Sequence, residues 1–301
     1  MFLHLTILDQ FNCSCRGPVT SQLQFVELIK KLQETPSPSL NPPLFLFCLS
    51  EEAAAYNAKI LADHYFNLDQ VIRKQHPSQI SYGSEFRSVD QLRDLLHLHP
   101  LWPRLREILE NGATFPLAEI PDAERLIDLN FHFKRGNHKS ATDHHQVLLD
   151  LIKEDVERGF ALPLPMSILH CIPNASLAPL GCIKQATVDA LGNKAFKHRM
   201  THDQSFPGPY NLSVNLRVLQ EKLPPIMYSF TLLRSIHYIL DIRKRHPCTK
   251  IYICKFDIDA AYRRCNLSSL TAFESLTIFA GFLLVALRMT LAVPLARPCG
   301  A

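Results

Sequence analysis

The sequence predicts an α+β protein in which a mainly helical first half precedes a second half of strands and one long helix. Apolar side chains recur at helical spacing in several segments up to Gly159, and short, proline-punctuated, strand-like segments follow it. Helices followed by mixed strands favour the α+β class over alternating α/β units. With 301 residues, 47% of them hydrophobic, the chain can hold one large domain or two ordinary ones.

Residues 1–95 are predicted to form a helical N-terminal region that contains a proline-rich linker at residues 35–43. Residues 21–34 carry a helical stripe of apolar side chains ahead of this linker. A second helix is expected to begin after Ser50, whose hydroxyl can cap it, and to run to about Tyr65.

Two short helices with clear end signals are expected next. Ser88 and Gln91 have the spacing of a capping box, and this helix should stop before Pro100. The next helix should begin near Leu101 and end at Gly112.

The clearest helical pattern lies at residues 143–159. Asp143 and Gln146 predict another capping box, and the pattern ends at a glycine. Residues 133–145 are basic and are expected to form a loop. Together with Arg125, this loop could touch nucleic-acid phosphates or be an ordinary solvated segment.

In the second half, a long helix is expected at about residues 226–244, followed by a strand at residues 250–259. The apolar run near the C-terminus, which ends at Arg288, is shorter than the roughly 20 residues that a membrane span requires. A buried strand or helix is therefore expected there, with no membrane segment.

The composition favours an intracellular protein, in the cytoplasm or the nucleus. Nine cysteines occur without a C-x-x-C pair, and the N-terminus lacks the features of a signal peptide, so reduced thiols are expected. A net charge of +4 identifies no partner, and the sequence leaves the oligomeric state open.

The stretch KFDIDAAYRRC, residues 255–265, places two carboxylates at the end of an apolar strand. Alternation puts Asp257 and Asp259 on one face, at the point where a buried strand would open into a cleft. Magnesium prefers carboxylate oxygens and phosphate oxygens, so a magnesium-assisted phosphoryl transfer is one reading. A half-buried strand with a polar face is the other.

This stretch resembles motif A of retrotransposon reverse transcriptases, in which an Asp at a strand end is followed by an aromatic residue at the fifth place. The resemblance implies that Asp257 is the catalytic, metal-binding carboxylate and that the backbone of Ile258 faces the metal. Tyr262 would lie under the sugar and exclude a 2′-hydroxyl. Asp259 has no role in the family pattern and is expected to be a surface acid.

Residues 177–215 resemble the fingers hairpin of the same family, with lysines on one strand, a glycine turn, and a basic residue on the next strand. By this resemblance Arg199 grips the incoming triphosphate, with Lys184 as a second candidate for nucleotide binding. Arg199 could instead be an ordinary surface residue of a strand. Asp203 is expected to order the following loop.

The resemblance implies that residues 96–301 form the fingers and part of the palm of a right-hand polymerase. The implied activity is RNA-templated DNA synthesis with magnesium, a template-primer of RNA or DNA, and deoxynucleotides. The chain as written is expected to be inactive, because Glu274 is its only acidic residue after Asp259 and no second acidic motif or thumb follows. The magnesium site would be incomplete.

The C-terminal sequence suggests a reading-frame change. Family members continue past a segment like ALRMT as F-G-G-A-P-x-P, and one added base ahead of Leu291 allows the reading F-G-G-A-P-C-P-S-L-W-G. We hypothesise a one-base deletion or a gene-model error there, which the genomic sequence tests. Two alternatives to an enzyme remain: a non-enzymatic nucleic-acid-binding remnant, and a helical interaction protein in which Asp257 is incidental.

Overall fold

The computed structural model describes residues 44–76, 78, 80–84, 87–188, 192–223, 231–248, 250–251 and 261–290, all of which belong to one compact unit, Leu40–Ala301. The predicted helix at residues 21–34, the linker at 35–43 and nearly all of the strand at 250–259 lie outside these residues. The predicted α+β class is confirmed, because helices and antiparallel strands occur together in this unit.

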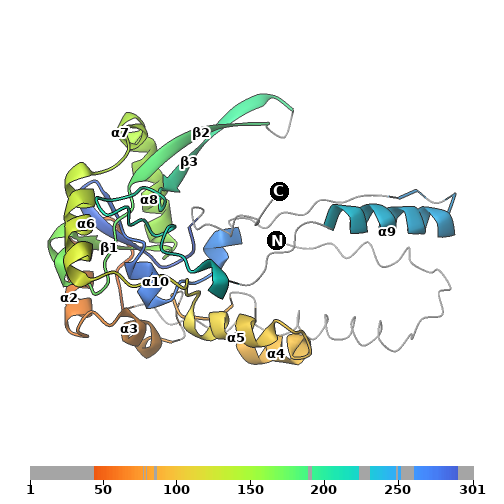
Figure 1. The fold of residues 1–301 in the computed structure, drawn as a ribbon, viewed down its shortest axis with the longest axis horizontal. Helices are drawn as coiled ribbons and strands as arrows, with labels where there is room; N and C mark the ends of the chain where they lie inside the picture. The colour runs from red at the N-terminus through yellow and green to blue at the C-terminus, as the bar shows by residue number, and fades with distance from the viewer. Residues whose placement is uncertain are drawn as a thin grey trace. The chain divides into compact units, whose positions relative to one another are not determined.

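Helices make up most of the described chain before the first strand and recur twice after the hairpin (Figure 1). The α-helices are α2 (Glu51–Ala62), α3 (Leu68–Lys74), α4 (Val89–Leu96), α5 (Trp102–Asn111), α6 (Asp122–Arg135), α7 (Lys139–Asp143), α8 (His145–Glu157), α9 (Thr231–Arg245) and α10 (Ser269–Phe273). Short 3-10 helices are η1 (Met166–Cys171), η2 (Gln220–Lys222) and η3 (Ala261–Arg264).

The strands form two antiparallel sheets. One has three strands in the order β1 (Ala161–Pro165), β5 (Phe282–Ala286) and β4 (Thr277–Phe279). The other is a hairpin of β2 (Leu180–Val188) and β3 (Lys194–His202), drawn as a long twisted ribbon in Figure 1.

The apolar run near the C-terminus forms the strands β4 and β5. This confirms the prediction of a buried strand or helix, and of the two alternatives the structure has strands. Ala280 and Gly281 both have positive φ, 48° and 86°, as a tight two-residue hairpin turn requires. In the described part of the chain, no helix has the length and apolar character needed to cross a membrane.

The main hydrophobic core joins the first helices to the three-stranded sheet. Phe45 and Leu61 are fully buried in the same cluster as Leu162 of β1 and Leu283 of β5. A second cluster places the apolar face of α8 beneath the base of the hairpin, where Leu180 is fully buried. The hairpin is thus anchored at its base to the body of the protein.

The local end signals read from the sequence are largely confirmed. Ser50 accepts a hydrogen bond from the Ala53 amide at 3.2 Å, although α2 ends at Ala62 and not at Tyr65. Ser88 and Gln91 form the predicted capping box. Gly112 ends α5 with a φ of 78°, and a Cβ there would lie 2.6 Å from the backbone of Leu267.

Two sequence predictions around residue 140 are wrong. The predicted basic loop is mostly helical, because α6 continues to Arg135 and α7 begins at Lys139; a basic composition does not disfavour a helix. The capping box of Asp143 and Gln146 does not form, because Asp143 already belongs to α7 and His144 precedes α8 without a side-chain cap.

The buried Asn57 ties α2 to the strand β1. Its side-chain oxygen accepts from the Leu46 amide at 2.8 Å, and its amide nitrogen donates to the carbonyls of Leu46 at 2.9 Å and Pro163 at 3.1 Å. Removing this side chain breaks three hydrogen bonds to the backbone, of which the one to Pro163 is buried.

We predict that Asn57→Ala lowers the free energy of unfolding by about 3 kcal/mol, because three hydrogen bonds of a fully buried side chain are lost and each contributes about 1 kcal/mol. Urea denaturation followed by circular dichroism measures this change. Lys59→Ala, at an exposed position of the same helix, is the matched control and should change stability little. Equal effects of the two substitutions would contradict the role given to Asn57.

Candidate functional site

The β2–β3 hairpin carries two of the residues that the sequence singled out. Its register pairs Ile183 with Arg199 and Lys184 with His198. Directly paired residues of an antiparallel ribbon share a face, and neighbours along a strand alternate. Arg199 and Lys184 are both exposed, but they therefore lie on opposite faces of the hairpin.

The face that carries Arg199 is polar along the outer part of the hairpin. The Arg199 guanidinium donates to the side-chain oxygen of Gln185, and Lys197 lies opposite Gln185 in the register. At the base of the same face, a Cβ on Gly181 would lie 2.8 Å from the Thr201 hydroxyl. The missing side chain lets the two strands and α7 approach closely there.

The face that carries Lys184 combines positive charge with an exposed aromatic ring. The Lys184 ammonium lies 4.4 Å from the ring centroid of Phe196, which is 63% exposed. The His198 ring lies 4.9 Å from that of His144, between centroids. An exposed ring beside an ammonium group suits base stacking and phosphate contact.

The loop after β3 is held by Asp203, which confirms the ordering role expected for this residue. The Asp203 carboxylate accepts from the Ser205 amide at 3.2 Å and lies 2.9 Å from Nε2 of His138. Asn215 completes the loop by donating from its side-chain amide to the Ser205 hydroxyl at 2.6 Å.

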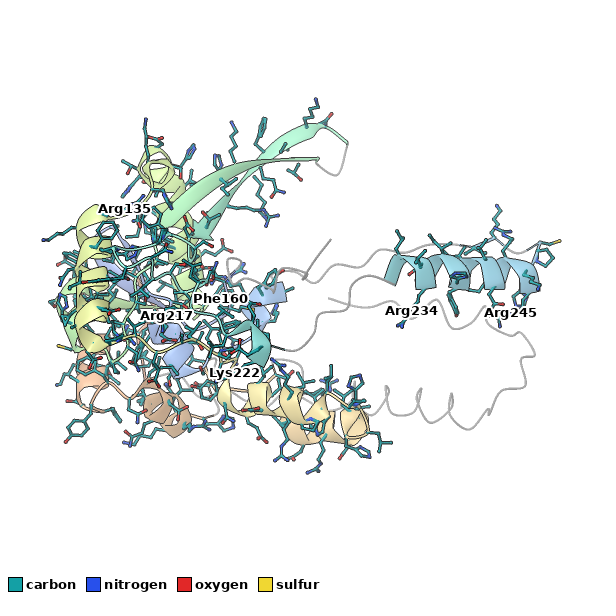
Figure 2. The ribbon with its side chains drawn as sticks, in the orientation of Figure 1. Arg135, Phe160, Arg217, Lys222, Arg234 and Arg245 are labelled. Carbon is teal, nitrogen blue, oxygen red and sulfur yellow. The ribbon has the colours of Figure 1, made fainter. Side chains whose placement is uncertain are left out.

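The arginines near this loop are partly engaged in the fold. Arg135 lies at the end of α6 (Figure 2). Its guanidinium is 3.8 Å from the ring centroid of Phe206. Arg125 donates to the Asn174 carbonyl at 3.1 Å, and burial lowers the pKa of its guanidinium. The suggested contact of Arg125 with template phosphates would have to compete with this bond.

Tyr262 lies in η3 and is 40% exposed. The next residue, Arg263, forms a largely buried ion pair with Asp155 of α8. Burial raises the pKa of the Asp155 carboxyl, and the Arg263 charge opposes that rise. The pair fixes the segment around Tyr262 against the helix that supports the hairpin.

A small cavity separates this ion pair from the base of β3. It measures about 10 Å³, room for roughly one water molecule, and Asp155, Met200, His202 and Arg263 are among its lining residues. Neither ring nitrogen of His202 has a hydrogen-bond partner among the described residues. Burial lowers the pKa of His202 to about 3, so this imidazole is neutral in the folded protein.

The expected metal ligands, Asp257 and Ile258, lie outside the described residues and are not part of this geometry. Asp259, expected to be a surface acid, also lies outside them. Glu274, the only later acid, is buried and its carboxylate lies 2.8 Å from the Arg217 guanidinium. No group of three or more His, Cys, Asp or Glu side chains in the described part of the chain could hold a metal ion.

Sequence reasoning missed Asp155, His202 and Arg263. A signal was present for the first of these, because Asp155 interrupts the apolar helical stripe of α8 formed by residues such as Ile152. The pairing with Arg263 joins residues 108 positions apart, which no local pattern predicts.

No family model, curated protein or solved structure matches this chain.

The neutral, buried His202 predicts a stability that depends on pH. The unfolded imidazole has a pKa near 6.5 and the folded one a pKa of about 3, so the unfolded state binds more protons between these values. Stability should therefore fall by about 2 kcal/mol from this residue alone between pH 7.5 and pH 5.

Urea denaturation of the wild-type protein and of His202→Leu at both pH values measures this contribution. The variant removes the titrating group and two unpaired nitrogens, so its loss of stability over the same range should be about 2 kcal/mol smaller. Parallel pH profiles for the two proteins would contradict the buried, neutral state of His202.

Proposed function

We propose that this chain is the fingers and part of the palm of a polymerase related to reverse transcriptases, and that it binds nucleotides and nucleic acid. The observation that carries the proposal is the β2–β3 hairpin, which lies where the resemblance expects a fingers hairpin and exposes Arg199 and Lys184. The hairpin is anchored at its base and carries basic residues along its length, and both properties suit contacts with phosphate groups.

In this proposal Arg199 binds the triphosphate of an incoming deoxynucleotide. Its planar guanidinium can make two parallel hydrogen bonds to phosphate oxygens, and Gln185 orients it in the absence of a ligand. The position of Lys184 on the other face favours a separate contact, with a nucleic-acid strand.

The reaction implied by the resemblance is attack of a primer 3′-hydroxyl on the α-phosphate of the nucleotide. Asp257 and the backbone of Ile258 would hold magnesium, which stabilises the charge that develops on the phosphate oxygens. Tyr262 would restrict the sugar to a deoxyribose. The buried ion pair beside it holds this segment in place.

Efficient synthesis is not expected from the 301 residues. The family's metal site needs carboxylates beyond Asp257, and Glu274 is committed to a buried ion pair with Arg217. Separating the two would leave an unpaired buried charge, which typically costs about 3–5 kcal/mol. The proposed function is therefore binding with little or no polymerisation.

A non-enzymatic nucleic-acid-binding protein is the second candidate. The observation that favours it is the exposed Phe196 ring with the Lys184 ammonium above it, an arrangement that can bind a single strand without any metal. A helical interaction protein with neither activity is the third reading.

We predict that the protein binds Mg²⁺–deoxynucleoside triphosphate and that Arg199→Ala weakens this binding at least about tenfold, since a charge-assisted phosphate contact contributes roughly 1.5–3 kcal/mol. Isothermal titration calorimetry measures the affinity. Arg104→Ala, at an exposed arginine of α5, is the matched control and should leave it unchanged. Equal affinities of the wild-type protein and Arg199→Ala would remove Arg199 from the site.

We predict that single-stranded RNA or DNA binds with an affinity that falls steeply with salt, and that Phe196→Ala weakens binding about fivefold or more through lost stacking. Fluorescence anisotropy at several salt concentrations measures both effects. A primer-extension assay completes the test: magnesium-dependent synthesis by the chain would refute its predicted inactivity. Absence of all binding would favour the helical interaction protein.

A further inference from the structure

Helix α6 buries two titratable side chains and exposes most of its large apolar ones. Asp128 and His132 are buried, at 4% and 5% exposure, whereas Leu126, Ile127 and Phe133 are 42–48% exposed and Phe131 is 38% exposed. A surface helix normally buries its apolar side chains and exposes its charges. Leu129, at 5% exposure, is the one large apolar side chain of α6 that is buried, and the other four reach the solvent-exposed surface of the helix.

Contacts with the loop after β3 hold Asp128 and His132 on the buried side of α6. A Cβ on Gly208 would lie 1.5 Å from Oδ1 of Asp128, so the loop after β3 approaches this carboxylate as closely as a glycine permits. The Phe206 ring meets the His132 ring edge-on, with 5.8 Å between centroids. The exposed apolar face is therefore a consequence of the fold itself.

We propose that this outer face of α6 binds α6 of a second copy of the chain, with the two helices antiparallel. The charges at the two helix ends point to this partner. Asp122 and Glu124 lie in the first turn, and Lys134 and Arg135 lie in the last turn. An antiparallel pair related by a two-fold axis brings the acidic end of each helix beside the basic end of the other.

The same symmetry places the apolar residues together. With Glu124 beside Lys134 of the second copy, Ile127 of one helix lies beside Phe131 of the other, and the reciprocal contacts follow. A parallel pair would instead bring acidic ends together and basic ends together. Because Arg135 already stacks on Phe206, the Glu124–Lys134 pair is the main ionic contact.

The size of the surface predicts a weak dimer. α6 has 14 residues and is about 21 Å long, so one helix pair covers less than the roughly 800 Å² per partner of a standard interface. We therefore expect a dissociation constant in the micromolar range, around 1–100 μM. The contact does not depend on nucleotide binding.

Sedimentation equilibrium of the full chain over a wide concentration range tests the proposal. The wild-type protein should dimerise, and Ile127→Asp should weaken dimerisation at least about tenfold by placing a charge in the apolar centre. Glu124→Lys alone and Lys134→Glu alone should each weaken it about fivefold to tenfold, because each creates two like-charge contacts. Glu107→Lys on α5 is the matched charge-reversal control.

Mixing the two single variants separates this geometry from general effects on folding. Glu124→Lys and Lys134→Glu should form a heterodimer with affinity near that of the wild-type pair, because both ionic contacts are then restored. A protein that stays monomeric at all concentrations would overturn the proposal. So would dimerisation that Ile127→Asp leaves intact, or variants whose mixture does not regain affinity.

Discussion

The pairing of Ile183 with Arg199 is the constraint on which the functional interpretation depends. It fixes the register of the β2–β3 hairpin, and a shift of one residue would move Arg199 to the face that now carries Lys184 and Phe196. The buried base of the hairpin, where Leu180 and His202 pair, holds that register against slippage. The hairpin therefore presents two chemically different faces, which our proposal assigns to a triphosphate and to a strand of nucleic acid.

The base of this hairpin and the segment around Tyr262 are held by one buried cluster. Arg263 reaches Asp155 of α8, and His202 of β3 lines the same small cavity. Burying the charges of Arg263 and Asp155 costs free energy, which their mutual attraction offsets. Removing either partner would leave the other charge unpaired and would strongly destabilise the fold. Residues that the proposal places at a nucleotide are thus linked through the interior of the protein.

The sequence predicted features that depend on neighbouring residues and missed those that depend on distant ones. The cap at Ser50, the capping box at Ser88 and the stop at Gly112 were correct because each uses groups within one helical turn. The burial of Asp128 on α6 was not foreseeable. The loop that covers its carboxylate contains Gly208, which is 80 positions further along the chain. The capping box predicted at Asp143 did not form, because Asp143 is the last residue of α7 and cannot also cap the next helix. Residue spacing alone does not reveal such a neighbouring helix.

The proposed site could be predicted from the sequence only in part. The sequence pattern predicted that Lys184 and Arg199 lie on a hairpin, but only the strand register shows that they lie on opposite faces.

The measurement that tests the central claim most directly is photocrosslinking of the full chain with an azido-deoxynucleoside triphosphate and Mg²⁺, mapped by mass spectrometry. We predict labelled peptides from the β2–β3 hairpin and from the segment that contains Tyr262, competed by unlabelled deoxynucleotide. Labelling confined to other segments, or labelling that competitor does not reduce, would contradict a polymerase-like nucleotide site.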